Sequence, residues 1–138
     1  MIYKVEEGLY KVELATKIDR PNVNGSNYDV DSLFRAIDKM PDAFKVLTKS
    51  HQPSISQGDL STYTSIILDD ILGSVTEVHY EVDEPYMMVE SSDDIMRPFM
   101  EEDCYAGARL LADVARNSEL LIITHLVCWD IVSDCNWK

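Results

Sequence analysis

The sequence predicts an α+β fold: one β-rich domain over residues 1–138, arranged as a partly open barrel or a sandwich with two or three short helices. Three observations lead to this prediction. A length of 138 residues suits a single core, and an apolar fraction of 46% is that of a globular protein. Short alternating apolar and polar runs, separated by turn formers, recur along the chain and are typical of strands.

The first elements are a hairpin and a helix. Residues 2–5 and 9–14 alternate apolar and polar around a turn at 6–8, which predicts two antiparallel strands. The segment 19–28 is dense in Pro, Asn and Gly, which favour restricted or left-handed backbone and so predict a shaped loop. A helix is expected over 30–39, where Asp29 can cap the first turn. Its apolar stripe consists of Leu33, Phe34, Ile37 and Met40.

Pro41 is expected to end that helix and to open a second, short helix that carries Phe44 and Leu47. Residues 49–63 are polar and rich in helix and strand breakers, so an exposed loop is predicted there.

The middle of the chain predicts strands at 65–68, 71–82 and 86–89. A short helix should follow Ser92, and Pro98 should limit it to a turn or two. In the strand at 71–82 the alternation is clear, with three residues expected to face inward: Val78, Tyr80 and Val82.

The last third contains one strong and one ambiguous pattern. Residues 120–132 are almost continuously apolar and β-branched, which predicts a buried central strand or a bent pair of strands. The composition of 104–116 favours a helix, although alternate residues would also suit a strand. Those alternating residues are Ala108, Leu110, Ala112 and Val114.

Charge is distributed unevenly along the chain. The net charge is −13, and residues 50–96 contain ten acids without a single Lys or Arg. Such a field repels nucleic acid and membrane surfaces, so neither is expected as a direct partner. The segment is a solvated face, a binding surface for a basic protein, or a mimic of DNA phosphates. The residues predicted to bind a protein partner are Asp69, Asp70, Glu77, Glu81, Asp83 and Glu84.

Groups that could carry chemistry are few. Cys104, Cys128 and Cys135 form no close pair, and acids stand near the N-terminus where a secretion signal has its apolar core. Free thiols in a cytosol are therefore expected. The sequence has no glycine-rich phosphate loop, metalloprotease motif or nucleophile elbow. We therefore predict no catalytic residues, no cofactor and no metal site.

Residues 21–28 read Pro-Asn-Val-Asn-Gly-Ser-Asn-Tyr and are followed by the helical stripe described above. This order resembles the N-terminal block of the prohead maturation proteases of tailed bacteriophages, in which a strand leads into a P-N-x-N-G-x-x-Y turn and then a helix. Residues 71–78 and 122–132 look like two later strands of that family. The resemblance implies the β-barrel serine protease fold that the family shares with herpesvirus assemblins.

The residues that the family uses for catalysis are missing at the matching positions. The family's histidine follows a Gly-acid-Leu triplet and precedes a proline, but here the triplet at 58–60 is followed by Ser61. The family's nucleophilic serine stands just before an arginine, and here Ala108 precedes Arg109. Acyl transfer needs a nucleophile beside a base. The resemblance therefore implies a protease scaffold without the activity.

Two functions remain, with an enzyme of unrecognised type as a third that ranks below them. The first is a non-catalytic bacteriophage virion or assembly protein, a capsid decoration or accessory component that binds capsid protein and forms a homo-oligomer where the particle requires it. The second is a phage-encoded acidic inhibitor of a host defence or nucleic-acid-binding protein, acting through the negative segment 50–96. Both imply a protein partner in the host cytoplasm, and the first also implies incorporation into the virion.

Overall fold

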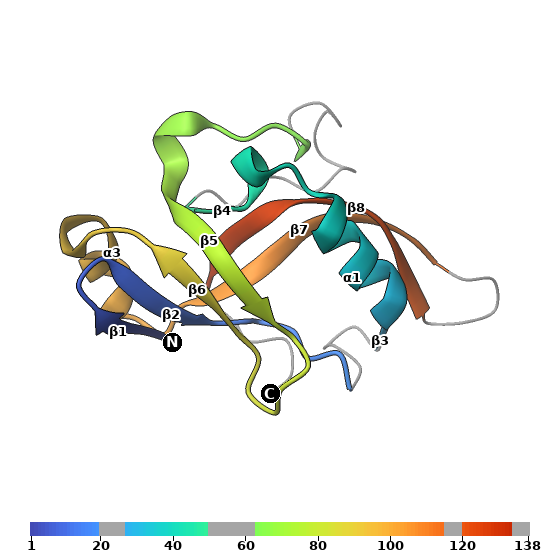
Figure 1. The fold of residues 1–138 in the computed structure, drawn as a ribbon, viewed down its shortest axis with the longest axis horizontal. Coiled ribbons are helices and arrows are strands. Elements are labelled where there is room, and N and C mark those ends of the chain that lie inside the picture. Colours follow the sequence, from blue (N-terminus) through green and yellow to red (C-terminus); the bar gives the residue numbers. More distant parts are fainter. Residues whose placement is uncertain (20–26, 50–62, 115–119, 134–138) are drawn as a thin grey trace.

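The computed structural model describes residues 1–19, 27–49, 63–114 and 120–133, which form a β-rich fold (Figure 1). Eight strands in these ranges belong to one open sheet, accompanied by short helices, so the predicted fold class is confirmed. The strands are β1 (Ile2–Glu6), β2 (Leu9–Glu13), β3 (Asn27–Tyr28), β4 (Val46–Thr48), β5 (Ile71–His79), β6 (Tyr86–Glu90), β7 (Tyr105–Val114) and β8 (Leu120–Val132). The helices are α1 (Val30–Lys39), α3 (Asp93–Met100) and the 3-10 turns η1 (Asp42–Phe44) and η2 (Leu68–Asp70).

The strand β8 organises the sheet. Along one side it pairs antiparallel with β7, and along the other it pairs in parallel with β3 and β4 (Figure 1). From β4 the sheet continues through β5, β6 and β2 to β1. An isolated bridge between Leu14 and Ala106 brings the start of β7 against the end of β2. The sheet therefore curls back towards itself without closing, which agrees with the predicted partly open architecture.

The N-terminal hairpin is confirmed. Its turn contains Gly8 at φ 80°, a left-handed conformation that glycine adopts without a steric cost. Tyr10 and Val12 of β2 are fully buried in the core, whereas Tyr3 and Val5 of β1 are 44% and 55% exposed. The two faces of the hairpin thus differ, and β1 forms the outer edge of the sheet.

The helix α1 begins at the predicted cap, because the Asp29 carboxylate accepts a hydrogen bond from the backbone N–H of Ser32 at 3.1 Å. Leu33 is fully buried, while Phe34 and Ile37 pack partly buried against the same core. The helix lies across β8, where the Ser32 hydroxyl accepts a hydrogen bond from the backbone N–H of Ile123 (Figure 1).

Two predictions in the next part of the chain were wrong. The expected second helix is only the 3-10 turn η1, and Leu47 lies in β4 because that short strand is paired on both sides, to β5 and β8. The expected strand at 65–68 is not formed either. The backbone carbonyl of Ser65 accepts a hydrogen bond from Arg109 at 2.7 Å. The backbone here therefore bonds to a buried side chain instead of to a neighbouring strand.

The helix favoured for 104–116 was also wrong. Tyr105–Val114 form β7, paired with β8 along its whole length, with register shifts after Arg109 and after Leu111. The free edge of β8 offers a pairing partner to each residue of this segment. Pairing with that strand outweighs the preference of its Ala and Leu residues for a helix. The single strand β8 confirms the prediction of a buried central strand.

The short helix after Ser92 is confirmed, since α3 has eight residues, about two turns, although Pro98 lies inside it and does not end it. One strand boundary differs from the prediction. The strand β5 ends at His79, which pairs with the first residue of β6. Beyond that pair the chain turns back, and Val82, predicted to face inward, is 40% exposed.

Some predictions fall outside the described residues. These are the turn at 20–26, most of the loop expected at 49–63, and Cys135.

A buried ion pair joins the central strands. Arg109 of β7 and Asp130 of β8 are 3% and 5% exposed, and the guanidinium donates to both carboxylate oxygens, at 2.9 Å from Nε and 2.6 Å from Nη2. Asp130 also accepts a hydrogen bond from the hydroxyl of Thr48 in β4. With the bond from Nη1 to Ser65, four separate segments meet at one guanidinium–carboxylate pair.

The first prediction concerns this pair. Asp130→Ala leaves the Arg109 charge buried without its partner, and we expect it to lower the free energy of unfolding by about 3–5 kcal/mol. Replacing both residues, as Arg109→Met with Asp130→Leu, should cost clearly less than Asp130→Ala alone. Urea denaturation followed by circular dichroism measures both. The control is Lys49→Ala, which removes an exposed pair with Asp70 at 3.9 Å and should cost less than about 1 kcal/mol. An Asp130→Ala variant as stable as this control would contradict the role given to the pair.

The second prediction concerns Gly73 in β5. A Cβ at this position would lie 2.4 Å from the backbone oxygen of Glu90 and 2.6 Å from Cγ1 of Val89. Gly73→Ala should therefore destabilise the protein by on the order of 2 kcal/mol or more, because a paired backbone cannot move aside. Gly107→Ala is the control, since its Cβ would meet only the side chain of Val132 at 3.2 Å. Thermal unfolding of the two variants should rank them in that order, and equal melting temperatures would refute the argument.

Candidate functional site

The structure divides the six predicted partner-binding acids into two groups. Asp69 and Asp70 lie in η2, before the start of β5. The other four, Glu77, Glu81, Asp83 and Glu84, surround the opposite end of the β5–β6 hairpin and are all exposed. The nine residues of β5 separate the groups by roughly 25 Å, at about 3.3 Å per residue. One continuous six-acid surface is therefore not formed. We call the group at the end of the β5–β6 hairpin the hairpin-tip acids.

His79 lies between two of the hairpin-tip acids. Its Nδ1 is 3.1 Å from Glu81 and its Nε2 is 3.3 Å from Glu77. The bond to Glu81 raises the pKa of His79 above its usual 6.5, helped by Glu77 and opposed by partial burial. Glu81 is affected in turn, since its own backbone N–H and His79 lower the pKa of its carboxyl group. The charge of this end of the hairpin thus depends on the protonation of one imidazole.

A row of side chains continues from His79 across the outer face of the sheet. His79 is paired with Tyr86 in β6, and Tyr86 with Glu13 in β2. The rings of His79 and Tyr86 are 4.9 Å apart, and the Nζ of Lys11 lies 4.6 Å from the centre of the Tyr86 ring. The alternation predicted at 71–82, with Val78, Tyr80 and Val82 inward, implies that Glu77, His79 and Glu81 face outward. Lys11 was missed, because only the strand register brings it there.

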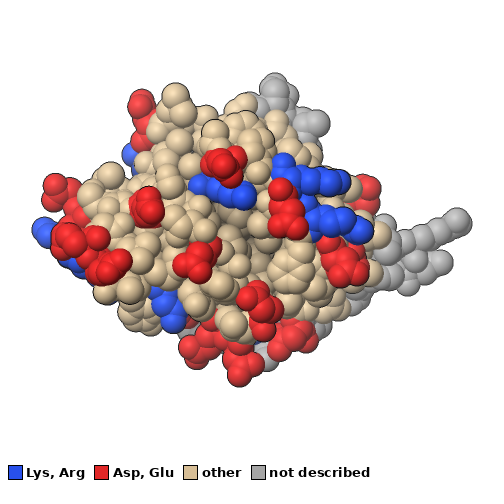
Figure 2. All heavy atoms as spheres, viewed as in Figure 1, with Lys and Arg blue, Asp and Glu red and all other residues tan. Residues whose placement is uncertain are grey.

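Charge gathers at two places on the visible face of the molecule. Figure 2 shows acidic side chains along the lower edge, where the β5–β6 turn lies, and at the left end, over β1 and α3. Lys and Arg appear mainly towards the upper right of this view, near α1. On this face the acids at the lower edge and the left end have few basic neighbours, whereas those near α1 lie among Lys and Arg.

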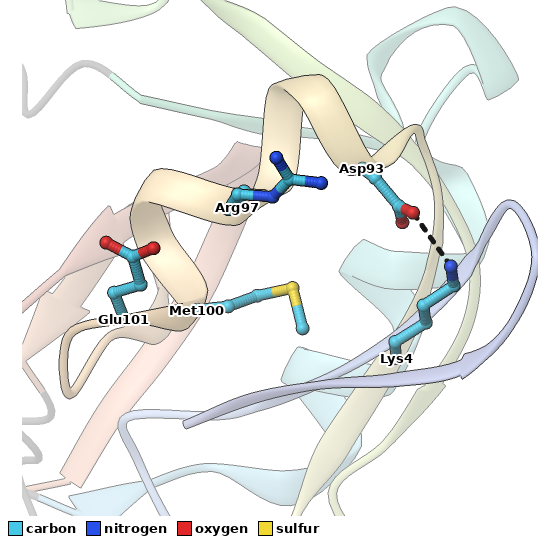
Figure 3. Close-up of a pocket in the computed structure, with 5 residues that line it drawn as sticks. All are labelled: Lys4, Asp93, Arg97, Met100 and Glu101. Atoms are coloured by element: carbon cyan, nitrogen blue, oxygen red, sulfur yellow. Dashed lines mark hydrogen bonds and ion pairs between the residues drawn. The ribbon is translucent and has the colours of Figure 1, made fainter.

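A hollow of about 350 Å³ lies at the left end, between α3 and β1. Figure 3 shows the side chain of Met100 directed towards β1, with Arg97 and Glu101 on the same helix. The Nζ of Lys4 donates to Asp93 at 2.8 Å, and the Tyr10 hydroxyl donates to the other oxygen of that carboxylate. These bonds, first that from Lys4, lower the pKa of Asp93. The ion pair between Lys4 and Asp93 thus joins β1 to α3 on one side of the hollow, and the side chain of Met100 forms its apolar floor.

The positions that resemble the protease centre are structural in this chain. Ala108 is paired with Trp129 and packs against the main core, while Arg109 is held in the buried ion pair. Burial, with a contribution from Asp130, raises the pKa of the Cys128 thiol to about 12. Burial likewise raises the pKa of Cys104. Neither thiol is in the ionised form that nucleophilic attack requires at neutral pH.

In the part of the chain that the structure describes, no cluster of three or more His, Cys, Asp or Glu side chains is arranged to hold a metal ion. None of the described helices is long and apolar enough to cross a membrane.

No protein-family model, curated protein or solved structure matches this chain. The resemblance to prohead maturation proteases therefore rests on the sequence motif itself and stays a prediction.

The third prediction follows from the geometry around His79. Because its folded-state pKa is raised, His79 stabilises the fold fully below about pH 6.5 and loses this contribution as the pH rises through the raised value. An NMR titration of the imidazole should give a pKa above 6.5. Glu81→Gln should bring it back towards 6.5, with a smaller effect for Glu77→Gln. A His79 pKa at or below 6.5 would contradict the assignment.

Proposed function

We propose that this chain is a non-catalytic protein-binding domain of a tailed bacteriophage, incorporated in or assembled with the capsid, and that the hairpin-tip acids contact a basic surface of its partner. The observation that carries the binding proposal is the clustering of Glu77, Glu81, Asp83 and Glu84 around one exposed hairpin end. The phage assignment rests on the motif at 21–28.

The arrangement of the hairpin tip suits binding by charge. Glu81, Asp83 and Glu84 lie beyond the last β5–β6 pair, His79–Tyr86, where the chain turns back, and Glu77 lies on β5 two residues before that pair. Lys11, which lies close by, has its ammonium group over the Tyr86 ring. A negative surface of this kind raises the rate of encounter with a positively charged partner and orients it. An interface of weak, repeated contacts on a symmetric particle needs no cleft.

The lack of catalysis is supported by the residues at the protease-like positions. Ala108 has no nucleophilic group, and the charge of Arg109 is neutralised by Asp130 within the core. The protonated thiol of Cys128 is buried between strands β7 and β8. A substrate would have to separate the central strands to reach any of these groups.

The inhibitor function is a second candidate, favoured by Glu77 and His79 of β5 together with Glu81, which follows the end of the strand and contacts His79. Carboxylates at this alternating spacing can occupy a site that a host protein uses for phosphates. The row is short, so we rank this function second.

The fourth prediction tests the proposed function. In gradient-purified particles of the encoding phage, mass spectrometry should find the chain at high copy number. The variant Glu77→Gln, Glu81→Gln, Asp83→Asn and Glu84→Gln should reduce its incorporation at least tenfold, because it removes the charge of the hairpin tip.

A control with the same net charge replaces four exposed acids elsewhere: Asp31, Asp38, Asp42 and Asp113, each by Asn. It should be incorporated normally. Absence of the unmodified chain from particles would refute the virion role. If affinity capture from infected cells then recovered one host protein, with binding that weakens steeply with salt, the inhibitor function would replace it.

A further inference from the structure

The hollow between α3 and β1 has a chemical character different from that of the hairpin tip. Its floor is the thioether side chain of Met100, and its sides are the aliphatic part of Lys4 and the side chain of Arg97 (Figure 3). The Lys4–Asp93–Tyr10 bonds hold the strand side of the hollow in place before anything binds. A preformed apolar hollow with fixed polar walls suits one apolar side chain of a partner.

The charged residues that line the hollow balance, Lys4 and Arg97 against Asp93 and Glu101, but the two segments that carry them, which we call its rim, are strongly negative. Residues 2–7 and 93–103 contain seven acids against Lys4 and Arg97, which leaves five uncompensated negative charges. Of these acids all but Asp93 are exposed, namely Glu6, Glu7, Asp94, Glu101, Glu102 and Asp103. A partner that enters the hollow is therefore favoured if its residues beside the apolar anchor are basic.

The edge of β1 adds a backbone contact. The backbone N–H of Glu13 donates to the carbonyl of Met1 at 3.0 Å, and Ile2 is in register with Val12. In an antiparallel pair the hydrogen-bonded positions alternate, so Tyr3 bonds towards β2 while the N–H and C=O of Lys4 point away from it. Lys4 is exposed and also lines the hollow, so we expect its outward backbone groups to be next to a segment bound there.

We propose that the hollow between α3 and β1 binds an extended, basic segment of a partner protein. One apolar side chain of the segment rests on Met100, its flanking Lys or Arg side chains pair with the acids of the rim, and its backbone bonds to Lys4. This is strand addition at a sheet edge beside a helix, in which the main chain supplies affinity and the hollow supplies specificity. It goes beyond the proposed function, because it is a second surface that lies apart from the hairpin tip.

The fifth prediction uses three fluorescein-labelled peptides of eight residues. The first alternates Leu with Lys and Arg, the second replaces its basic residues by Glu and Asp, and the third replaces its Leu by Ser. Fluorescence anisotropy should show binding of the first peptide and at least tenfold weaker binding of the other two. Absence of binding by the first peptide would overturn the proposal, as would equal binding of the Leu and Ser peptides.

Variants locate the site. Met100→Lys places a positive charge on the floor of the hollow and should weaken binding of the basic peptide at least tenfold. Phe44→Lys, an exposed apolar residue outside the hollow, is the matched control and should leave binding within twofold. The fourfold hairpin-tip variant should also leave it within twofold. Loss of binding in the hairpin-tip variant but not in Met100→Lys would assign the peptide to the proposed-function surface and overturn this second site.

Hydrogen exchange on the unmodified protein tests the backbone contact without any substitution. Saturating basic peptide should slow exchange of the Lys4 amide at least tenfold, while the Tyr3 amide, already bonded towards β2, should change little. Equal exchange of the Lys4 amide with and without peptide would refute pairing at the β1 edge.

Discussion

The buried pair of Arg109 and Asp130 is the interaction on which the rest of the fold depends. An uncompensated charge in the core is so costly that the two strands carrying these residues must stay in one register. The same pair binds Thr48 of β4 and the backbone at Ser65, so strands and a connecting segment converge on it. On the opposite face of β8 the indole N–H of Trp129 donates to Tyr80 at 3.2 Å. The central strand is thus held from both sides.

This fixed centre leaves two acidic regions at the periphery. The β5–β6 hairpin extends from β4 and carries exposed acids at its end, Glu77 on β5 and three more beyond the last paired residues. The β1–β2 hairpin lies beyond β6 and carries α3 on its inner side, with the side chain of Asp93 bonded to Tyr10 and Lys4. The two regions differ in kind. The hairpin tip offers charge with a titratable imidazole, whereas the hollow combines charge with an apolar floor and a free strand edge.

The central strands also account for the absence of a recognisable reactive centre in them. A protease scaffold presents its nucleophile from a strand with room beside it for a substrate. The stretch of β7 that resembles the protease nucleophile motif has Ala108 against the core on one face and Arg109 with its carboxylate on the other. In the described residues these side chains contribute to the stability of the strand pair.

The sequence by itself determined the elements whose signals are local. The alternation of residues 2–14, the Asp29 cap and the β-branched run of 120–132 each predicted the structure found, because turn chemistry, capping and continuous burial leave direct marks in neighbouring residues. Only the tertiary structure decided the state of 105–114, where pairing with β8 outweighs helical composition. It also decided which acids share a surface, since β5 separates Asp70 from Glu81, and it placed Lys11 beside Tyr86. Strand register and side-chain contacts between distant segments set these features, and no short stretch of sequence encodes them.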